Sequence, residues 1–190
     1  MNPPPRVIAF FDGQNIRYRS REAFPGASDD YNPRKLADLI AARQGWQLVE
    51  TRYYSGIPDP TIDPHRAKIS RRRLRRIAFG GCVLTTRTFR YNADGTGREK
   101  GIDIRIALDL LRLGLQRQMD VALIFSQDQD FAEVADEIRA MNIRHGHFVR
   151  MASAFPSDPA YTNRRGIDRT DWHPFTRQDW DSCLYPHHPK

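Results

Sequence analysis

Four aspartates stand where an α/β sheet would bring them together. Asp12 closes one apolar run of the sequence, and Asp128 and Asp130 follow another. Asp103 opens the apolar helical stretch that precedes the second run. In an open parallel sheet the ligand crevice lies outside the carboxyl ends of the strands, so these carboxylates can converge on one point. Crowded carboxylates repel one another unless a cation lies between them, and a hard divalent ion suits them best.

The chemistry expected of such a site is the hydrolysis of a phosphodiester with one or two bound metal ions. No Cys or His accompanies the four aspartates, which favours Mg²⁺ or Mn²⁺ over Zn²⁺. In the segment that starts at Asp128, alternate residues just past a strand point the same way, so Asp128 and Asp130 could both face the crevice. Asn15 and Ser126 are placed to hydrogen-bond a ligand carboxylate or the phosphate.

Each aspartate taken alone has a simpler explanation. Asp128 or Asp130 could cap the helix that follows, and Asp103 could be a favourable charge in a first helical turn. The occurrence of all four at one end of a sheet favours the shared site. Asp109 is six residues from Asp103 and therefore lies elsewhere on the same helix, where a polar tie inside the fold is the better interpretation.

The elements that must position these residues alternate between strands and helices. Strands are predicted at 6–11, 47–54, 82–89, 121–126 and 147–151, with a short sixth at 170–175. Helices are predicted at 64–79, 102–115 and 131–141, with one more starting at Asn32-Pro33 and a last turn after Thr176. Residues 13–32 are expected to be a polar connection, and the helix at 102–115, apolar nearly all round, is expected to pack against the sheet. This order predicts an α/β fold with a parallel sheet and helices on both faces.

The composition limits the class of protein. A chain of 190 residues suits one domain, and its formal charge of +7 favours an anionic partner. Two cysteines give no disulfide framework, and the longest apolar runs fall far short of the roughly 20 residues of a spanning helix. We therefore expect a cytoplasmic protein that does not enter a membrane. Residues 1–5 are predicted to be a disordered lead-in, 6–151 the domain that carries the acidic site, and 152–190 an extension packed on it.

One predicted helix is strongly basic. The stretch 66–76 carries seven cationic side chains and no acid. Such a cluster favours binding of phosphates, although a solvated helix face can show the same pattern. Further cations follow Asp12 and precede Asp103. The residues predicted to bind nucleic acid are Arg17, Arg19, Arg71, Arg72, Arg73, Arg75, Arg76 and Lys100. Among the tyrosines that could stack on bases, Tyr53 and Tyr54 are more typical of a strand core.

Three short motifs carry a family resemblance. They are Phe11–Asn15, Glu99–Asp103 and Ser126–Phe131, and together they resemble the NYN domain family, in particular its LabA-like group within the PIN-like nuclease superfamily. The resemblance implies a PIN-like three-layer α/β/α sandwich with a central, mainly parallel sheet, and metal-dependent cleavage chiefly of RNA. Its acidic positions correspond to Asp12, Asp103, Asp128 and Asp130, with Asn15 and Ser126 as polar companions in the catalytic site.

The chain departs from the family pattern at Gln127, where a glycine commonly follows the serine. A side chain there could narrow the cleft, which bears on turnover more than on metal binding. The leading hypothesis is thus an Mg²⁺- or Mn²⁺-dependent ribonuclease, and the alternative is a catalytically weak or inactive RNA-binding regulatory module. A metal-dependent phosphatase for small phosphoesters would leave the basic helix unexplained. DNA as a substrate and a homodimer both stay open.

Overall fold

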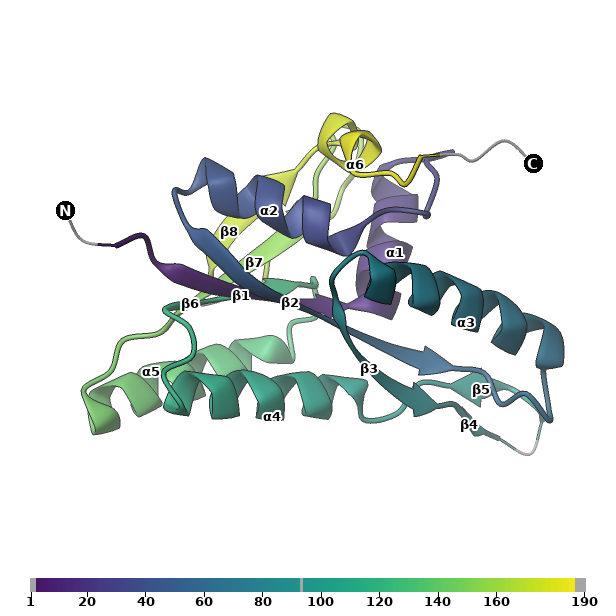
Figure 1. Cartoon of the computed structure of the whole chain (residues 1–190), viewed down its shortest axis with the longest axis horizontal. Helices are drawn as coiled ribbons and strands as arrows, with labels where there is room; N and C mark the ends of the chain where they lie inside the picture. The colour runs from purple at the N-terminus through teal and green to yellow at the C-terminus, as the bar shows by residue number, and fades with distance from the viewer. Residues whose placement is uncertain (1–2, 93, 187–190) are drawn as a thin grey trace.

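A six-stranded parallel sheet forms the centre of the protein, as a computed structural model of residues 3–92 and 94–186 shows (Figure 1). Met1 and Asn2, the start of the predicted lead-in, lie outside the described residues. The strand order is β3-β2-β1-β6-β7-β8. The strands are β1 (Arg6–Asp12), β2 (Gln47–Ile57), β3 (Val83–Thr88), β6 (Val121–Phe125), β7 (Arg150–Pro156) and β8 (Asp171–Phe175). β1 and β6 are central neighbours, so their carboxyl ends lie side by side.

Helices cover both faces of this sheet. One face carries α1 (Gly13–Ala23), α2 (Pro33–Arg43), α3 (Pro64–Phe79) and α6 (Arg177–Ser182), and the other carries α4 (Ile102–Leu115) and α5 (Phe131–His145). Alternate residues of β1 enter the two cores, with Phe11 on the first side and Phe10 on the second. The predicted α/β fold with a parallel sheet is confirmed, and its layers are consistent with a PIN-like sandwich.

The predicted polar connection at 13–32 is wrong, because α1 occupies its first half. The Asp12 carboxylate caps this helix by accepting a hydrogen bond from the backbone N–H of Asn15 at 3.1 Å. The helix buries Ile16, Ser20 and Ala23 at helical spacing. Since only one of these three side chains is large and apolar, the sequence shows almost no amphipathic pattern there.

One further prediction of local structure needs correction, and another is confirmed in its bounds and in its packing against the sheet. The fifth strand was expected at 147–151, but α5 runs on to His145 and β7 spans Arg150–Pro156. Small alanines and a terminal proline give β7 a weak strand signature, although Met151–Pro156 is buried throughout. The bounds of α4 were predicted correctly. Its outer side nevertheless exposes Ile104 by 65% and Leu108 by 57%, so the helix is not buried all round.

The C-terminal residues belong to the same packed body. The predicted strand β8 pairs with β7, and α6 follows it. Trp180 is buried against Tyr31, with ring centroids 4.1 Å apart, and donates its indole N–H to the carbonyl oxygen of Ser28 at 2.7 Å. A separate antiparallel pair, β4 (Arg90–Tyr91) and β5 (Gly97–Arg98), projects beyond the end of β3. Within the described parts of the chain, no helix has the length and apolar character needed to cross a membrane.

Candidate active site

Asp12 is the most buried carboxylate of the predicted site. It ends β1 and is only 4% exposed. One carboxylate oxygen, Oδ1, accepts the Asn15 backbone N–H, and the other, Oδ2, accepts the Ser126 hydroxyl at 3.2 Å. Both predicted companions, Asn15 and Ser126, therefore hold this carboxylate in position.

The same polar residues fix the loop after β6. The backbone N–H of Gln127 donates to Asn15 Oδ1 at 3.0 Å, and the backbone N–H of Asp128 donates to Ser126 Oγ at 3.2 Å. These bonds join the start of α1 to the loop that carries Asp128. The carboxyl ends of β1 and β6 thus form one hydrogen-bonded unit, as the placement of the residues predicts.

Three of the four predicted metal ligands line one cavity of about 330 Å³. They are Asp12, Asp103 and Asp128, and Asn15 lines it as well. Asp130 does not line this cavity. It takes a helical backbone conformation at the start of α5, so the alternation expected from Asp128 to Asp130 does not extend to it. Its charge still acts on Asp103, whose pKa it helps to raise.

Glu99 is a fifth carboxylate of the site, and it was not among the site residues predicted from the sequence. It lines the same cavity and accepts a hydrogen bond from the backbone N–H of Gly56 at its Oε1. Its position four residues before Asp103, inside the second family motif, was the available signal. Neither strand nor helix periodicity could place it, because it follows the short strand β5.

The carboxylates of the cavity are partly or fully buried, and their negative charges act on one another. Burial, reinforced by the charges of Asp103 and Asp128, raises the pKa of Asp12 to about 7 against the opposing hydrogen bonds from Asn15 and Ser126. Burial and the charges of Asp12 and Asp103 likewise raise the pKa of Glu99 to about 7. The pKa of Asp103 is raised by burial and then by Asp128. A cation in the cavity would relieve all of these effects.

The donor set suits a partly hydrated Mg²⁺ or Mn²⁺. Every side chain offered is a hard oxygen ligand, and Mg²⁺ commonly keeps several waters and binds through one or two carboxylates. Among residues 3–92 and 94–186, no three Asp, Glu, His or Cys side chains converge into a ready-made ligand cage. The residues therefore fit an ion that retains water ligands better than one fully enclosed by protein.

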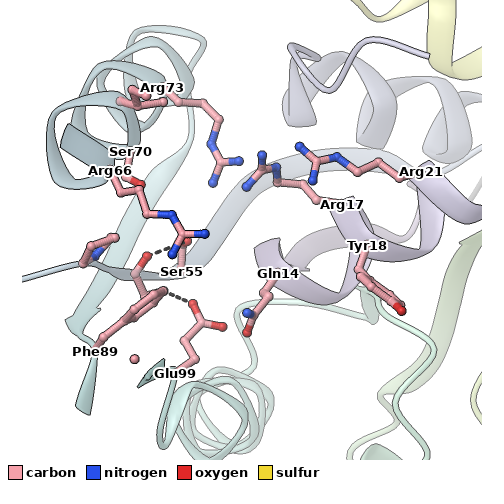
Figure 2. Close-up of a pocket in the computed structure, with 14 residues that line it drawn as sticks. Gln14, Arg17, Tyr18, Arg21, Ser55, Arg66, Ser70, Arg73, Phe89 and Glu99 are labelled. Atoms are coloured by element: carbon pink, nitrogen blue, oxygen red, sulfur yellow. Dashed lines mark hydrogen bonds between the residues drawn. The ribbon is translucent and has the colours of Figure 1, made fainter. Parts of the chain in front are cut away.

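A second cavity, of about 410 Å³, continues from the first and is basic. The two share Gln14, Tyr18 and Glu99. Figure 2 shows that α1 and α3 extend arginine side chains toward one another across this second cavity, with Glu99 on its opposite wall. These arginines are Arg17 and Arg21 from α1 and Arg66 and Arg73 from α3. Together the two cavities form one groove that is acidic at one end and basic at the other, which we call the active-site groove.

The predicted nucleic-acid-binding residues divide into separate groups. Arg17 and Arg73 line the basic cavity, where Arg17 also pairs with Asp29. Arg19 lines the acidic cavity, and Arg72 lines a cavity beside the groove. Arg76 lines the same neighbouring cavity, but its side chain is held by Asp30 and donates to the carbonyl oxygen of Pro186 at 3.2 Å. The remaining three side chains are exposed and line none of these cavities; they are Arg71, Arg75 and Lys100.

Gln127 does not narrow the groove. Its side-chain Nε2 donates to the carbonyl oxygens of Asn163 and Arg165, at 3.0 and 2.8 Å. The side chain is buried, and it is absent from the lining of both cavities. The residue that departs from the family pattern therefore packs against the C-terminal extension.

The remaining polar and aromatic candidates are structural. Asp109, 1% exposed, accepts the Tyr54 hydroxyl at 3.0 Å and pairs with Arg105 and Arg112, which confirms the predicted polar tie. Burial opposes its ionisation, but the Tyr54 hydroxyl and the two guanidinium groups outweigh that effect and lower its pKa. Tyr53 and Tyr54 are fully buried, so neither ring is available to bases.

A parallel α/β sheet with carboxylates gathered at the carboxyl ends of its central strands is consistent with a nuclease-like domain. The sequence profile of the NYN domain matches residues 6–159, and the chain belongs to the NYN domain family. This confirms the resemblance carried by the three motifs. The chain is 25% identical over 141 residues to the low amplitude and bright protein LabA of Synechococcus elongatus, covering 72% of this chain and 69% of that protein.

The fold is shared with a solved structure as well. A crystal structure of a protein of unknown function from Vibrio parahaemolyticus superposes with a TM-score of 0.63 at 20% sequence identity. The likeness covers 95% of this chain and 99% of the other. The shared fold is therefore longer than the segment matched by the NYN domain.

Proposed function

We propose that the protein is a metal-dependent ribonuclease that hydrolyses phosphodiester bonds of RNA in the active-site groove. The observation that carries the proposal is the polarity of that groove. Carboxylates suited to a divalent ion line one end, and arginines suited to phosphates line the other. A nucleic acid strand presents phosphates at regular spacing, so one phosphate can lie at the acidic end while its neighbours lie among the arginines.

Asp12, Asp103 and Asp128 would hold a hydrated Mg²⁺ or Mn²⁺, in part through its water ligands, and Asp130 is close enough to Asp103 to add its charge. The ion, when bound, supplies activation of water and neutralisation of charge on the phosphate. The protein's own residues orient the reactants. Ser126 and Asn15 fix the Asp12 carboxylate, while Arg17 and Arg73 hold the strand by phosphate contacts.

The principal alternative is an RNA-binding regulatory module without turnover. It was suggested by Gln127, whose side chain could have blocked the cleft. Since that side chain hydrogen-bonds to the C-terminal extension and leaves the groove open, the geometry favours the nuclease. A phosphatase for small phosphoesters is less well supported, because such a substrate would leave the basic end of the groove without a role.

The test is cleavage of an RNA with single-stranded and hairpin parts, at low salt, with Mn²⁺, Mg²⁺ or a chelator. Wild type is compared with Asp128→Asn and with the matched control Asp38→Asn. Asp38 is on α2, outside both cavities, and pairs only with Arg34 among the described residues. We expect metal-dependent cleavage by wild type and by Asp38→Asn, and none by Asp128→Asn. RNA binding without cleavage by wild type in either metal would establish the regulatory module instead.

A further inference from the structure

A third cavity, of about 380 Å³, opens beside the basic end of the active-site groove. It lies between the start of α3 and the β4–β5 hairpin. Its walls include Ile62, Phe89 and Tyr91, and Phe89 and Arg66 also line the basic cavity. A ligand that lies among the arginines can therefore reach this cavity without leaving the groove.

The aromatic wall is fixed in place by backbone contacts. The Tyr91 hydroxyl accepts the backbone N–H of Asp59 at 3.0 Å, and the Phe89 N–H donates to the carbonyl oxygen of Ile57 at 2.9 Å. Gly97 lies against both rings, so close that a Cβ there would come within 2.8 Å of Tyr91 and 3.0 Å of Phe89. The two rings thus form a preformed surface beside Ile62, which is 55% exposed although it is large and apolar.

The chemistry of this cavity suits a flat aromatic group attached to a phosphate. Aromatic and aliphatic side chains line its walls together with Asp63. Arg66 stands at the junction with the groove, where its largely exposed side chain also pairs with Asp63 at 3.7 Å. We infer that the cavity is a subsite for one unpaired nucleobase, which rests against Phe89 while the adjoining phosphate meets Arg66. This inference rests on the proposed function, because it assumes that the phosphates of RNA follow the groove.

The substrate class follows from this geometry. A base inside a duplex is stacked and paired, and extruding it costs a few kcal/mol. A single strand offers its bases without that cost. The subsite therefore selects single-stranded RNA, or the loop of a hairpin, and acts through Phe89 rather than through hydrogen bonds to base edges. We accordingly expect little discrimination among the four bases.

The test measures RNA binding with a chelator present, so that no cleavage occurs. A short single-stranded RNA carries the fluorescent base 2-aminopurine, and parallel RNAs replace that position by an abasic residue or pair it in a duplex. The variants are Phe89→Leu, which keeps an apolar side chain but removes the ring, and the control Phe79→Leu. Phe79 lies at the end of α3, is 86% exposed and lines none of the three cavities. Thermal melting verifies that both variants are folded.

We expect binding to quench the 2-aminopurine in wild type and Phe79→Leu but not in Phe89→Leu. Removing either the ring or the base should weaken binding about tenfold, and removing both should weaken it little further. The inference of a subsite would be overturned if wild type bound the abasic RNA as tightly as the RNA with 2-aminopurine, and if Phe89→Leu quenched 2-aminopurine as strongly as wild type. Metal-dependent cleavage would survive that result, so the proposed ribonuclease could stand without it. Absence of RNA binding by wild type would overturn both.

Discussion

The burial of Asp12 should make the metal-free protein lose stability as the pH rises. Its pKa is raised from 3.8 to about 7 in the folded chain, so the folded state binds a proton more tightly than the unfolded state does. A difference of about three pH units corresponds to about 4 kcal/mol above both pKa values. The substitution Asp12→Asn removes this cost while it keeps an oxygen that can accept the Asn15 N–H.

The sign of the effect sets its pH window. Between pH 3.8 and about 7 the folded protein retains a proton on Asp12 that the unfolded chain has released, so the free energy of unfolding falls as the pH rises. Below this window wild type and Asp12→Asn should differ little. Above it the variant should be the more stable, and the difference should level off because Asp12 is then ionised in both states of wild type.

The assay is thermal unfolding from pH 4 to pH 8.5 with a chelator present. For a chain of this size about 1 kcal/mol shifts Tm by about 2–4 °C. If only half of the roughly 4 kcal/mol, about 2 kcal/mol, is realised, the Tm of Asp12→Asn should exceed that of wild type by roughly 4–8 °C at high pH. The exposed Asp38→Asn serves as the control and should follow wild type throughout. If the difference in Tm between Asp12→Asn and wild type did not change with pH, the inference that burial raises the pKa of Asp12 would be refuted.

Three further predictions test the surroundings of the site. Gly13→Ala would bring a Cβ within 2.6 Å of the buried Tyr53 ring, so we expect a loss of about 1–3 kcal/mol, measured by urea unfolding. Asp109→Asn should cost about 1–3 kcal/mol at neutral pH, and thermal unfolding should show that its difference from wild type shrinks as the pH falls through the lowered pKa of Asp109. Gln127→Gly should expose 163–166 to limited proteolysis and leave metal-dependent cleavage in place. A large gain in its cleavage rate would instead show that Gln127 obstructs the groove.

The sheet was predictable because its central strands are buried on both faces. Continuous apolar runs of that length, such as Val121–Phe125, favour a buried strand, and the helices between them show regular periodicity or clear end signals. α1 was missed for the opposite reason. Its buried side is made of Gly13, Ile16, Ser20 and Ala23, which are small or polar except for Ile16. Close packing against the sheet, and not hydrophobic patterning, determines that helix.

The site was predictable to the extent that it follows from strand ends. Asp12 ends β1 and Asp128 lies in the loop that follows the neighbouring strand β6, so the adjacency of these strands brings both residues to one cavity. Glu99 reaches the same cavity through a bond to Gly56, a contact between segments 43 residues apart that no local pattern encodes. The basic residues show the same limit. Charge alone could not separate Arg73, which faces the groove, from Arg76, which holds Asp30 and the C-terminal residues.

The segment at 163–168 braces the loop that carries Asp128. Besides the two bonds from Gln127, Gln129 Nε2 donates to the carbonyl oxygen of Gly166 at 3.0 Å, and Gln129 Oε1 accepts the backbone N–H of Asp168 at 3.1 Å. These four bonds flank Asp128 on both sides in sequence, so they restrict the loop on which its carboxylate depends. The bracing segment lies beyond residue 159, where the match to the NYN domain ends. The loop that carries Asp128 is therefore held in part by residues beyond the matched segment, and the two bonds from Gln129 remain when glycine replaces Gln127.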